Sequence, residues 1–210
     1  MSVRLPPRIV ALTPGVARPA HAAVDELVRA ARAAFAAGLR GLVLRESSLP
    51  DREYLELAVR LRALFAVRDG AWLCLHDRPH LAVAVGADAV HVGGASLAPA
   101  DVRAWLAPEI ALGLSTHAGD DARTWSAADY VFHGPLHATT KPGARPPIGY
   151  AGLQRAVAAS ARPVWALGGI EPEHAVEIAS CGAQGLAVLS GLWARADVAA
   201  RTREYVAAWK

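Results

Sequence analysis

The chain has 210 residues, of which 53% are hydrophobic and 20% are charged, and its formal net charge is +3. This hydrophobic share excludes a disordered chain, and the dispersed arginines do not favour a nucleic-acid partner. No segment approaches the roughly 20 consecutive apolar residues of a membrane helix, and the N-terminus lacks the apolar run of a signal peptide, so we expect a cytoplasmic protein with no membrane partner.

Short apolar runs alternate with longer amphipathic segments about eight times along the chain. The runs expected to form strands are 9–12, 41–44, 71–75, 89–92, 110–114, 130–132, 163–167 and 185–189. The expected helices are 21–37, 51–68, 78–86, 99–106, 120–127, 149–160, 172–180 and 192–209. Nearly all the strand runs are continuous rather than alternating, which is typical of parallel strands covered on both faces.

Eight strand–helix units in a chain of this length predict a single (β/α)8 TIM barrel that spans residues 1–210. A doubly wound open sheet has the same alternation of elements. The number of units favours the barrel, and no GxGxxG motif follows the first strand.

The active site of such a barrel lies where the strands end, so the residues that follow each strand are the candidates. In chain order they are Thr13, Arg45, Glu46, His76, Asp77, 93–96, 115–117, the Pro- and Gly-rich loop 133–149, Gly168, Gly169, Ser190 and Gly191. Of these, Ser115 and Arg45 are expected to bind substrate. Arg45 could equally form a salt bridge with Glu46 at the rim.

Two glycine-bearing loops follow the last two strands. Gly168 and Gly169 lie in the first loop, and Ser190 and Gly191 lie in the second, which runs into a helix. Paired loops at these two strands commonly bind a phosphate through backbone N–H groups. The simpler interpretation is that the glycines only allow tight turns.

Lys141 is the only lysine of the chain besides Lys210, whereas the other basic residues are arginines. It follows the hydroxyls of Thr139 and Thr140 in the long loop, which suggests an anion contact rather than a solvated charge. Asp77 could hold Mg²⁺ through water, but a carboxylate two residues before a proline is also a common turn residue.

Two histidines flank the Gly134-Pro135 pair at the start of the long loop. His133 and His137 could move protons there, because the pKa of an imidazole lies near neutrality. They could also be polar loop residues without a chemical role. His91 lies within a strand, and we expect it to be a hydrogen-bonded interior residue.

These residues resemble the superfamily of thiamine phosphate synthase and TenI-type thiazole tautomerase. The similar segments are 44–46, 76–94, 112–117, 128–141, 163–170 and 182–193, in that order. The resemblance implies a small barrel that binds a thiazole phosphate, with the phosphate on the two glycine loops, and it suggests a homodimer.

The two branches of this superfamily need different sites. The synthase joins a pyrimidine diphosphate to a thiazole phosphate, and it holds the leaving diphosphate with Mg²⁺ between two aspartates and with several cations. Arg45, Asp77 and Lys141 match that pattern. The departures are Val43 for a glutamine, Ser47 for a lysine, His76 for an asparagine and Ser96 for the second aspartate.

The tautomerase branch isomerises a thiazole carboxylate phosphate without a metal. Segments 93–99 and 187–193 look more like this branch, although Pro135 stands where its catalytic histidine is expected. We therefore predict a metal-free thiazole tautomerase, an isomerase without a cofactor, in which His133 or His137 moves the proton. The alternatives are a divergent synthase that uses Mg²⁺ on Asp77 and a non-catalytic protein that binds a phosphate ligand.

Overall fold

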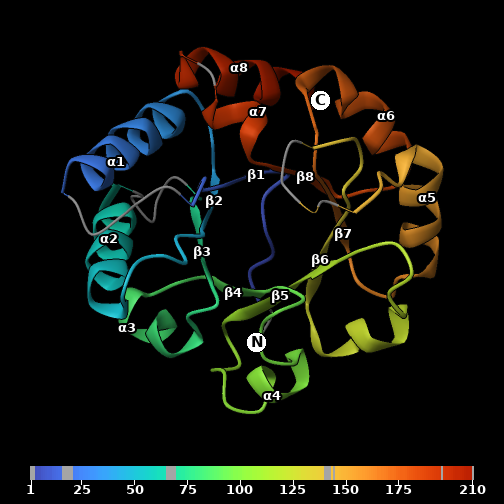
Figure 1. Ribbon diagram of the computed structural model, residues 1–210, viewed down its shortest axis with the longest axis horizontal. Helices are drawn as coiled ribbons and strands as arrows, with labels where there is room; N and C mark the ends of the chain where they lie inside the picture. Colours follow the sequence, from blue (N-terminus) through green and yellow to red (C-terminus); the bar gives the residue numbers. More distant parts are fainter. Residues whose placement is uncertain are drawn as a thin grey trace.

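The computed structural model describes residues 3–15, 21–64, 70–139, 143, 145–194 and 196–209. Within them eight parallel strands pair in chain order and close into a barrel, because β8 pairs with β1 (Figure 1). The strands are β1 (Ile9–Leu12), β2 (Gly41–Leu44), β3 (Trp72–His76), β4 (Ala89–Val92), β5 (Ala111–Thr116), β6 (Tyr130–His133), β7 (Val164–Leu167) and β8 (Gly185–Val188). The predicted (β/α)8 barrel is confirmed.

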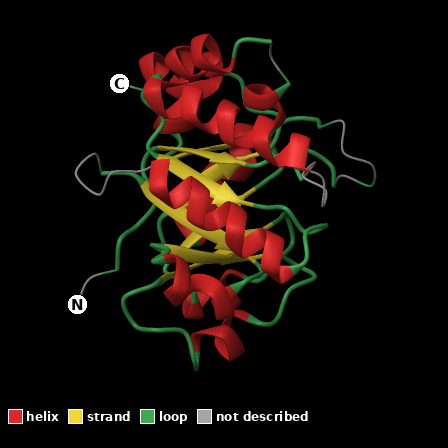
Figure 2. Cartoon of the chain, turned by 90° about the vertical axis from the view of Figure 1, so that its left-hand side faces the viewer, coloured by secondary structure: helices red, strands yellow, loops and turns green. Residues whose placement is uncertain are grey.

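Helices surround the strands on the outside (Figure 2). They are α1 (His21–Ala36), α2 (Asp51–Leu64), α3 (Ala82–Val85), α4 (Pro99–Arg103), α5 (Gly149–Ala159), α6 (Ala175–Ser180), α7 (Ser190–Trp193) and α8 (Val198–Ala208), with 3-10 turns η2 (Pro79–Leu81), η3 (Ala122–Ala127) and η4 (Pro172–His174). None of the helices in the described ranges is both long enough and apolar enough to cross a membrane.

The structure divides the helix that we predicted over 192–209. Its first part is α7, and α8 starts separately after Asp197, whose carboxylate accepts a hydrogen bond from the N–H of Ala200 at 2.8 Å. A side chain that caps free N–H groups in this way begins a new helix. The helix predicted over 120–127 is instead the 3-10 turn η3.

The sequences of the strands are continuous apolar runs because both faces of each strand are buried. One set of strand side chains packs against the surrounding helices, for example against Tyr54 and Leu57 of α2. The other set fills the barrel interior, where the largest members are Trp72, Tyr130, Phe132 and Trp165. The barrel is therefore packed rather than hollow.

The N-terminal segment covers the end of the barrel where the strands begin. The indole N–H of Trp72 donates to the carbonyl of Arg4 at 3.0 Å, and that of Trp165 donates to the carbonyl of Pro7 at 2.9 Å. A ligand site can therefore form at the opposite end, which we call the mouth, where the strands end.

Candidate active site

Asp77 follows β3 at the mouth with a φ of 56°, in the left-handed region that aspartate enters more readily than most residues. One carboxylate oxygen lies 3.1 Å from His76 Nδ1, and the other accepts a hydrogen bond from Ser96 Oγ at 2.5 Å. Partial burial would raise the pKa of Asp77, but the hydrogen bonds from His76 and Ser96 outweigh it and lower that pKa. Asp77 is therefore ionised at neutral pH.

Asp77 and Ser96 form an oxygen pair that suits a magnesium ion. Ser96 is held in place by the N–H of Gly93, which donates to its hydroxyl oxygen at 2.7 Å. Mg²⁺ prefers oxygen ligands and is commonly bound by one or two carboxylates, with water and substrate phosphates completing the set. The described residues contain no group of three or more His, Cys, Asp or Glu side chains that could hold a metal. The pair fits a magnesium ion that takes most of its ligands from water and substrate.

Arg45 follows β2, and its backbone N–H donates to Thr13 Oγ1 at 2.8 Å, which joins the ends of β1 and β2. Its guanidinium has no carboxylate within ion-pair distance among the described residues. The neighbouring Glu46 is buried and instead accepts a hydrogen bond from the N–H of Gly15 at 3.0 Å. This arrangement favours the anion-binding interpretation of Arg45 over the rim salt bridge.

Ser115, near the end of β5, is hydrogen-bonded to a histidine of the barrel interior. Its Oγ lies 2.8 Å from Nε2 of His91, which is wholly buried on β4. Nδ1 of His91 lies 3.3 Å from the hydroxyl of Tyr130, and that hydroxyl lies 3.6 Å from Sγ of Cys74. Burial, helped by the nearby His76, lowers the pKa of His91 well below its usual range, so its ring is neutral. His91 is thus hydrogen-bonded at both nitrogens, as expected.

His133 does not face the barrel interior. Tyr130 and Phe132 fill the interior, so the alternation of side chains along β6 directs His133 outward. There its Nδ1 lies 2.8 Å from Thr116 Oγ1, and its ring packs on Trp125 beside a cleft of about 520 Å³ between η3 and α5. Burial is the main cause that lowers its pKa. We expected His133 at the mouth, and the structure instead places it in the layer between strands and helices.

His137 packs beneath the loop that follows β7. Its ring centre lies 4.2 Å from that of His174 and 5.4 Å from that of Tyr150. Burial, and then the charge of His174, lower its pKa, and its Nε2 is a buried atom with no hydrogen-bond partner among the described residues. His133 and His137 have different neighbours, so the structure does not unite them in one acid–base pair.

Residues 135–138 of the loop after β6, which we call the strand-6 loop, pack closely on the glycine loop after β7. Gly168 and Gly169 have φ values of 94° and 63°, and a Cβ on Gly169 would lie 2.7 Å from the carbonyl oxygen of Ala138. The N–H of His137 donates to the carbonyl of Gly168 at 3.1 Å. These glycines therefore have a packing role whether or not they bind a phosphate. Thr139 is half-buried in the same loop, and Lys141 lies outside the described residues.

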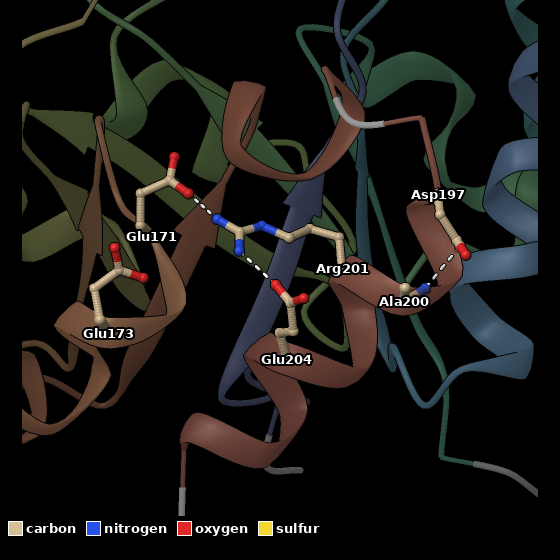
Figure 3. A pocket seen from close by; sticks show the side chains of 6 residues that line it. All are labelled: Glu171, Glu173, Asp197, Ala200, Arg201 and Glu204. Carbon is tan, nitrogen blue, oxygen red and sulfur yellow. Dashed lines mark hydrogen bonds and ion pairs between the residues drawn. The ribbon is translucent and has the colours of Figure 1, made fainter.

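Side chains of α8 contact both glycine loops, after β7 and after β8. Figure 3 shows the pocket in which some of these contacts lie. Arg201 forms ion pairs with Glu171 of the first loop and with Glu204 of its own helix, and its Nε donates to the carbonyl of Gly191 at 3.0 Å. One turn later, the hydroxyl of Tyr205 donates to the carbonyl of Ile170 at 2.7 Å. Ser190 begins α7 in the second loop.

Sequence reasoning missed two of these relationships. The contact between Ser96 and Asp77 joins two different loops, and Arg201 contacts loops that precede it by 10 and 30 residues. The spacing of Arg201 and Tyr205, four residues apart on one helix face, was the available signal. It could not indicate what that face contacts.

Comparisons with known proteins agree on one family. The chain matches the family model described as thiamine monophosphate synthase over residues 16–192. It is 40% identical over 186 residues to the thiamine-phosphate synthase of Laribacter hongkongensis, a match that covers 88% of each chain. It is 40% identical over 176 residues to that of Moorella thermoacetica, covering 82% of this chain and 83% of that one. The thiamine phosphate pyrophosphorylase structure from Pyrococcus furiosus has a TM-score of 0.82 at 27% identity and covers 96% of this chain and 95% of that one.

These findings overturn the prediction of a thiazole tautomerase. The relatives that match across most of the chain are named synthases, which are transferases, so the isomerase interpretation is wrong. It depended on a few loop residues, whereas the similarity to synthases extends over nearly all the strand–helix units. The proton-transfer role of His133 and His137 belonged to that interpretation, and we do not retain it. The superfamily resemblance is confirmed, and the chain belongs to the thiamine monophosphate synthase family.

Proposed function

We propose that this chain is a thiamine-phosphate synthase, which joins a pyrimidine diphosphate to a thiazole phosphate and releases diphosphate. The observation that carries the proposal is the 40% identity to a protein of that name over 88% of both chains. The site supports it with groups that suit an anion at the ends of β2 and β5 and with a carboxylate that would hold Mg²⁺ after β3. Both substrates are small molecules that carry phosphate, in keeping with the family.

Different residues at the mouth would bind the anionic groups of the two substrates. We assign the diphosphate to the side where Arg45, Ser115 and Asp77 lie, with Lys141 as a further cation by resemblance. The guanidinium of Arg45 has no carboxylate within ion-pair distance in the part of the chain that the structure describes, and it can bind two phosphate oxygens at once. Holding the leaving diphosphate in this way stabilises the charge that it gains as its bond to the pyrimidine breaks.

Asp77 and Ser96 are the residues that would hold a magnesium ion. When bound, Mg²⁺ supplies positive charge that neutralises the diphosphate. Because Ser96 is neutral, this pair contributes one negative charge where two aspartates would contribute two. We expect weaker magnesium binding than a site with two carboxylates would show.

The thiazole phosphate belongs to the other side of the mouth. Gly168, Gly169, Ser190 and Gly191 present backbone N–H groups there, and Thr139 lies on the adjacent strand-6 loop. A Cβ on Gly168, Gly169 or Gly191 would meet other protein atoms, so the glycines set the path of the two loops. The backbone N–H groups of these loops are the donors that a phosphate needs.

The proposal is tested by incubating the protein with a pyrimidine diphosphate, hydroxyethylthiazole phosphate and Mg²⁺. Release of diphosphate together with formation of thiamine phosphate, followed by chromatography, is the expected result. The Asp77→Asn variant, purified in the same way, controls for a contaminating host enzyme and should lose most of the activity. If both substrates raise the melting temperature but no diphosphate is released, the chain is a binding protein and not a synthase.

The homodimer stays a prediction. Size-exclusion chromatography with light scattering checks it, and a mass near 22.0 kDa would show a monomer.

A further inference from the structure

Four polar side chains form a continuous line through the barrel interior toward the mouth. They are Cys74, Tyr130, His91 and Ser115, and the three steps between them measure 3.6, 3.3 and 2.8 Å. The first three residues are wholly buried, and Ser115 is half-buried at the mouth. A buried polar group without a partner is costly, so the protons in this line must be arranged to satisfy every member.

The histidine ring is held in one orientation by its surroundings. It stacks on Phe132 with ring centres 4.4 Å apart and an angle of 27° between the planes. Gly113 on the neighbouring strand makes room for this arrangement, because a Cβ there would lie 2.4 Å from Nδ1 of His91 and 2.2 Å from the ring of Tyr130. This packing favours the ring orientation in which Nδ1 lies near Tyr130 and Nε2 near Ser115. The question that decides the role of His91 is which nitrogen carries the proton.

A neutral imidazole has one N–H donor and one acceptor nitrogen. The single phenolic proton of Tyr130 can go to Nδ1 of His91 or to the sulfur of Cys74. Because a thiol sulfur is a weak acceptor, the proton goes to the imidazole nitrogen. The thiol can then donate to the phenolic oxygen or to the carbonyl of Leu75, which lies 3.8 Å from its sulfur. Nδ1 is then the acceptor, so the proton of His91 is on Nε2, which faces Ser115.

This direction sets what Ser115 can do. With the N–H of His91 donating to its oxygen from inside the barrel, the hydroxyl proton of Ser115 is left to point toward the mouth. An anionic oxygen needs a donor at that place. If His91 were protonated at Nδ1 instead, Ser115 would donate its proton to Nε2. It would then present only lone pairs to the mouth, and these repel an anion.

We propose that His91 is a positioning residue that makes Ser115 a hydrogen-bond donor to an anionic oxygen of the substrate, with Tyr130 and Cys74 setting the direction of the line. The inference rests on the proposed function only in that Ser115 contacts an anion. The diphosphate of the pyrimidine substrate is the group that it would receive.

The first test reads the position of the proton directly and needs no activity. In protein labelled with ¹⁵N-histidine, a two-bond ¹H–¹⁵N correlation spectrum at pH 7.5 distinguishes the two neutral forms of a ring. We expect His91 to be protonated at Nε2, with the signal assigned by its loss in His91→Gln. In Tyr130→Phe, which removes the donor to Nδ1, we expect a mixture of both forms. A ring protonated at Nδ1 in the unaltered protein would overturn the inference, whether or not the chain is a synthase.

The second test asks whether His91 acts through Ser115. In the unaltered background, His91→Leu should lower kcat/KM for the pyrimidine diphosphate about tenfold, the scale of one hydrogen bond to a charged group. In the Ser115→Ala background the same substitution should lower it less than twofold. Equal losses in both backgrounds would show that His91 only supports the fold. His91→Gln, which can place an N–H near the position of Nε2, should restore part of the loss.

A neighbouring hydroxyl supplies the matched control. Thr116 follows Ser115 on β5, but its hydroxyl lies near His133 on the outward face of the barrel. Thr116→Ala should leave the KM for the pyrimidine diphosphate unchanged, whereas Ser115→Ala raises it. If the unaltered protein turns over no substrate, the affinity for inorganic diphosphate, measured by calorimetry, replaces kcat/KM in both tests.

Discussion

Ser96 donates a hydrogen bond to the carboxylate of Asp77, so the loops that follow β3 and β4 meet at one oxygen pair. The resemblance places the second metal-binding aspartate of synthases at position 96, and in this chain the serine at that position contacts Asp77. With serine at position 96, the pair carries one negative charge instead of two, and the loops after β3 and β4 still meet there.

Restoring that carboxylate should strengthen magnesium binding. In Ser96→Asp, we expect the Mg²⁺ concentration for half-maximal diphosphate release to fall about tenfold, because a second carboxylate adds a hard, charged ligand beside Asp77. A magnesium titration of initial rates measures it. Ser126→Asp, which adds the same charge at an exposed position on η3, is the control and should change nothing. An unchanged magnesium requirement in Ser96→Asp would contradict the assignment of this pair to the metal.

Adding the missing cation after β2 should improve diphosphate binding. Ser47 is exposed at the position where the resemblance expects a lysine. We expect Ser47→Lys to lower the KM for the pyrimidine diphosphate about threefold to tenfold and to leave that for the thiazole phosphate unchanged. Ser48→Lys places the same charge at the next exposed residue and should have a smaller effect. Equal effects of the two variants would mean that only the net charge of the protein matters.

Removing Arg201 should loosen both glycine loops at once. Arg201→Ala breaks the ion pair with Glu171 and the hydrogen bond to the carbonyl of Gly191. We expect the free energy of unfolding to fall by about 2 kcal/mol, the usual scale for a hydrogen bond to a charged group, and the KM for the thiazole phosphate to rise. Urea unfolding and steady-state kinetics measure the two effects. Arg203→Ala, on the exposed side of the same helix, should stay within about 0.5 kcal/mol.

The neutral state of His91 predicts how stability depends on pH. Because burial lowers its pKa in the folded protein, the unfolded chain binds more protons at pH values below about 6.5, and folding stability is lost as the pH falls through that range. One such group changes the free energy of unfolding by at most about 1.4 kcal/mol per pH unit. Between pH 7.5 and 5, this dependence should be shallower in His91→Leu than in the unaltered protein.

Urea unfolding at several pH values checks that prediction. Val90→Ala, on the same strand, destabilises the core without removing a titratable group and should keep the original slope. Some dependence should remain in His91→Leu, because burial also lowers the pKa of His133 and of His137. Identical slopes in His91→Leu and the unaltered protein would mean that His91 is protonated alike in the folded and unfolded states.

The sequence by itself determined the architecture, and it predicted the end of the barrel at which we place the site. Continuous apolar runs mark strands buried on both faces, and counting them predicts the barrel. Arg45, Asp77 and Ser115 are predicted because the active site of such a barrel lies where the strands end. This prediction needs no knowledge of the direction in which each side chain points. The choice between the two reactions was not determined in this way, since single loop residues pointed to the isomerase and similarity along the chain pointed to the synthase.

Only the tertiary structure decided which face each side chain occupies and what it meets there. A shift of one residue along a strand exchanges interior for exterior, so His133 and Phe132 lie on opposite sides of β6 although they are adjacent in the chain. The contacts of Ser96 with Asp77, of Ser115 with His91 and of Arg201 with Glu171 each join different elements. Pairing of β3 with β4 and of β4 with β5 brings the first two pairs together, and packing of the last helix brings the third together. Neither leaves a periodic signal in the sequence.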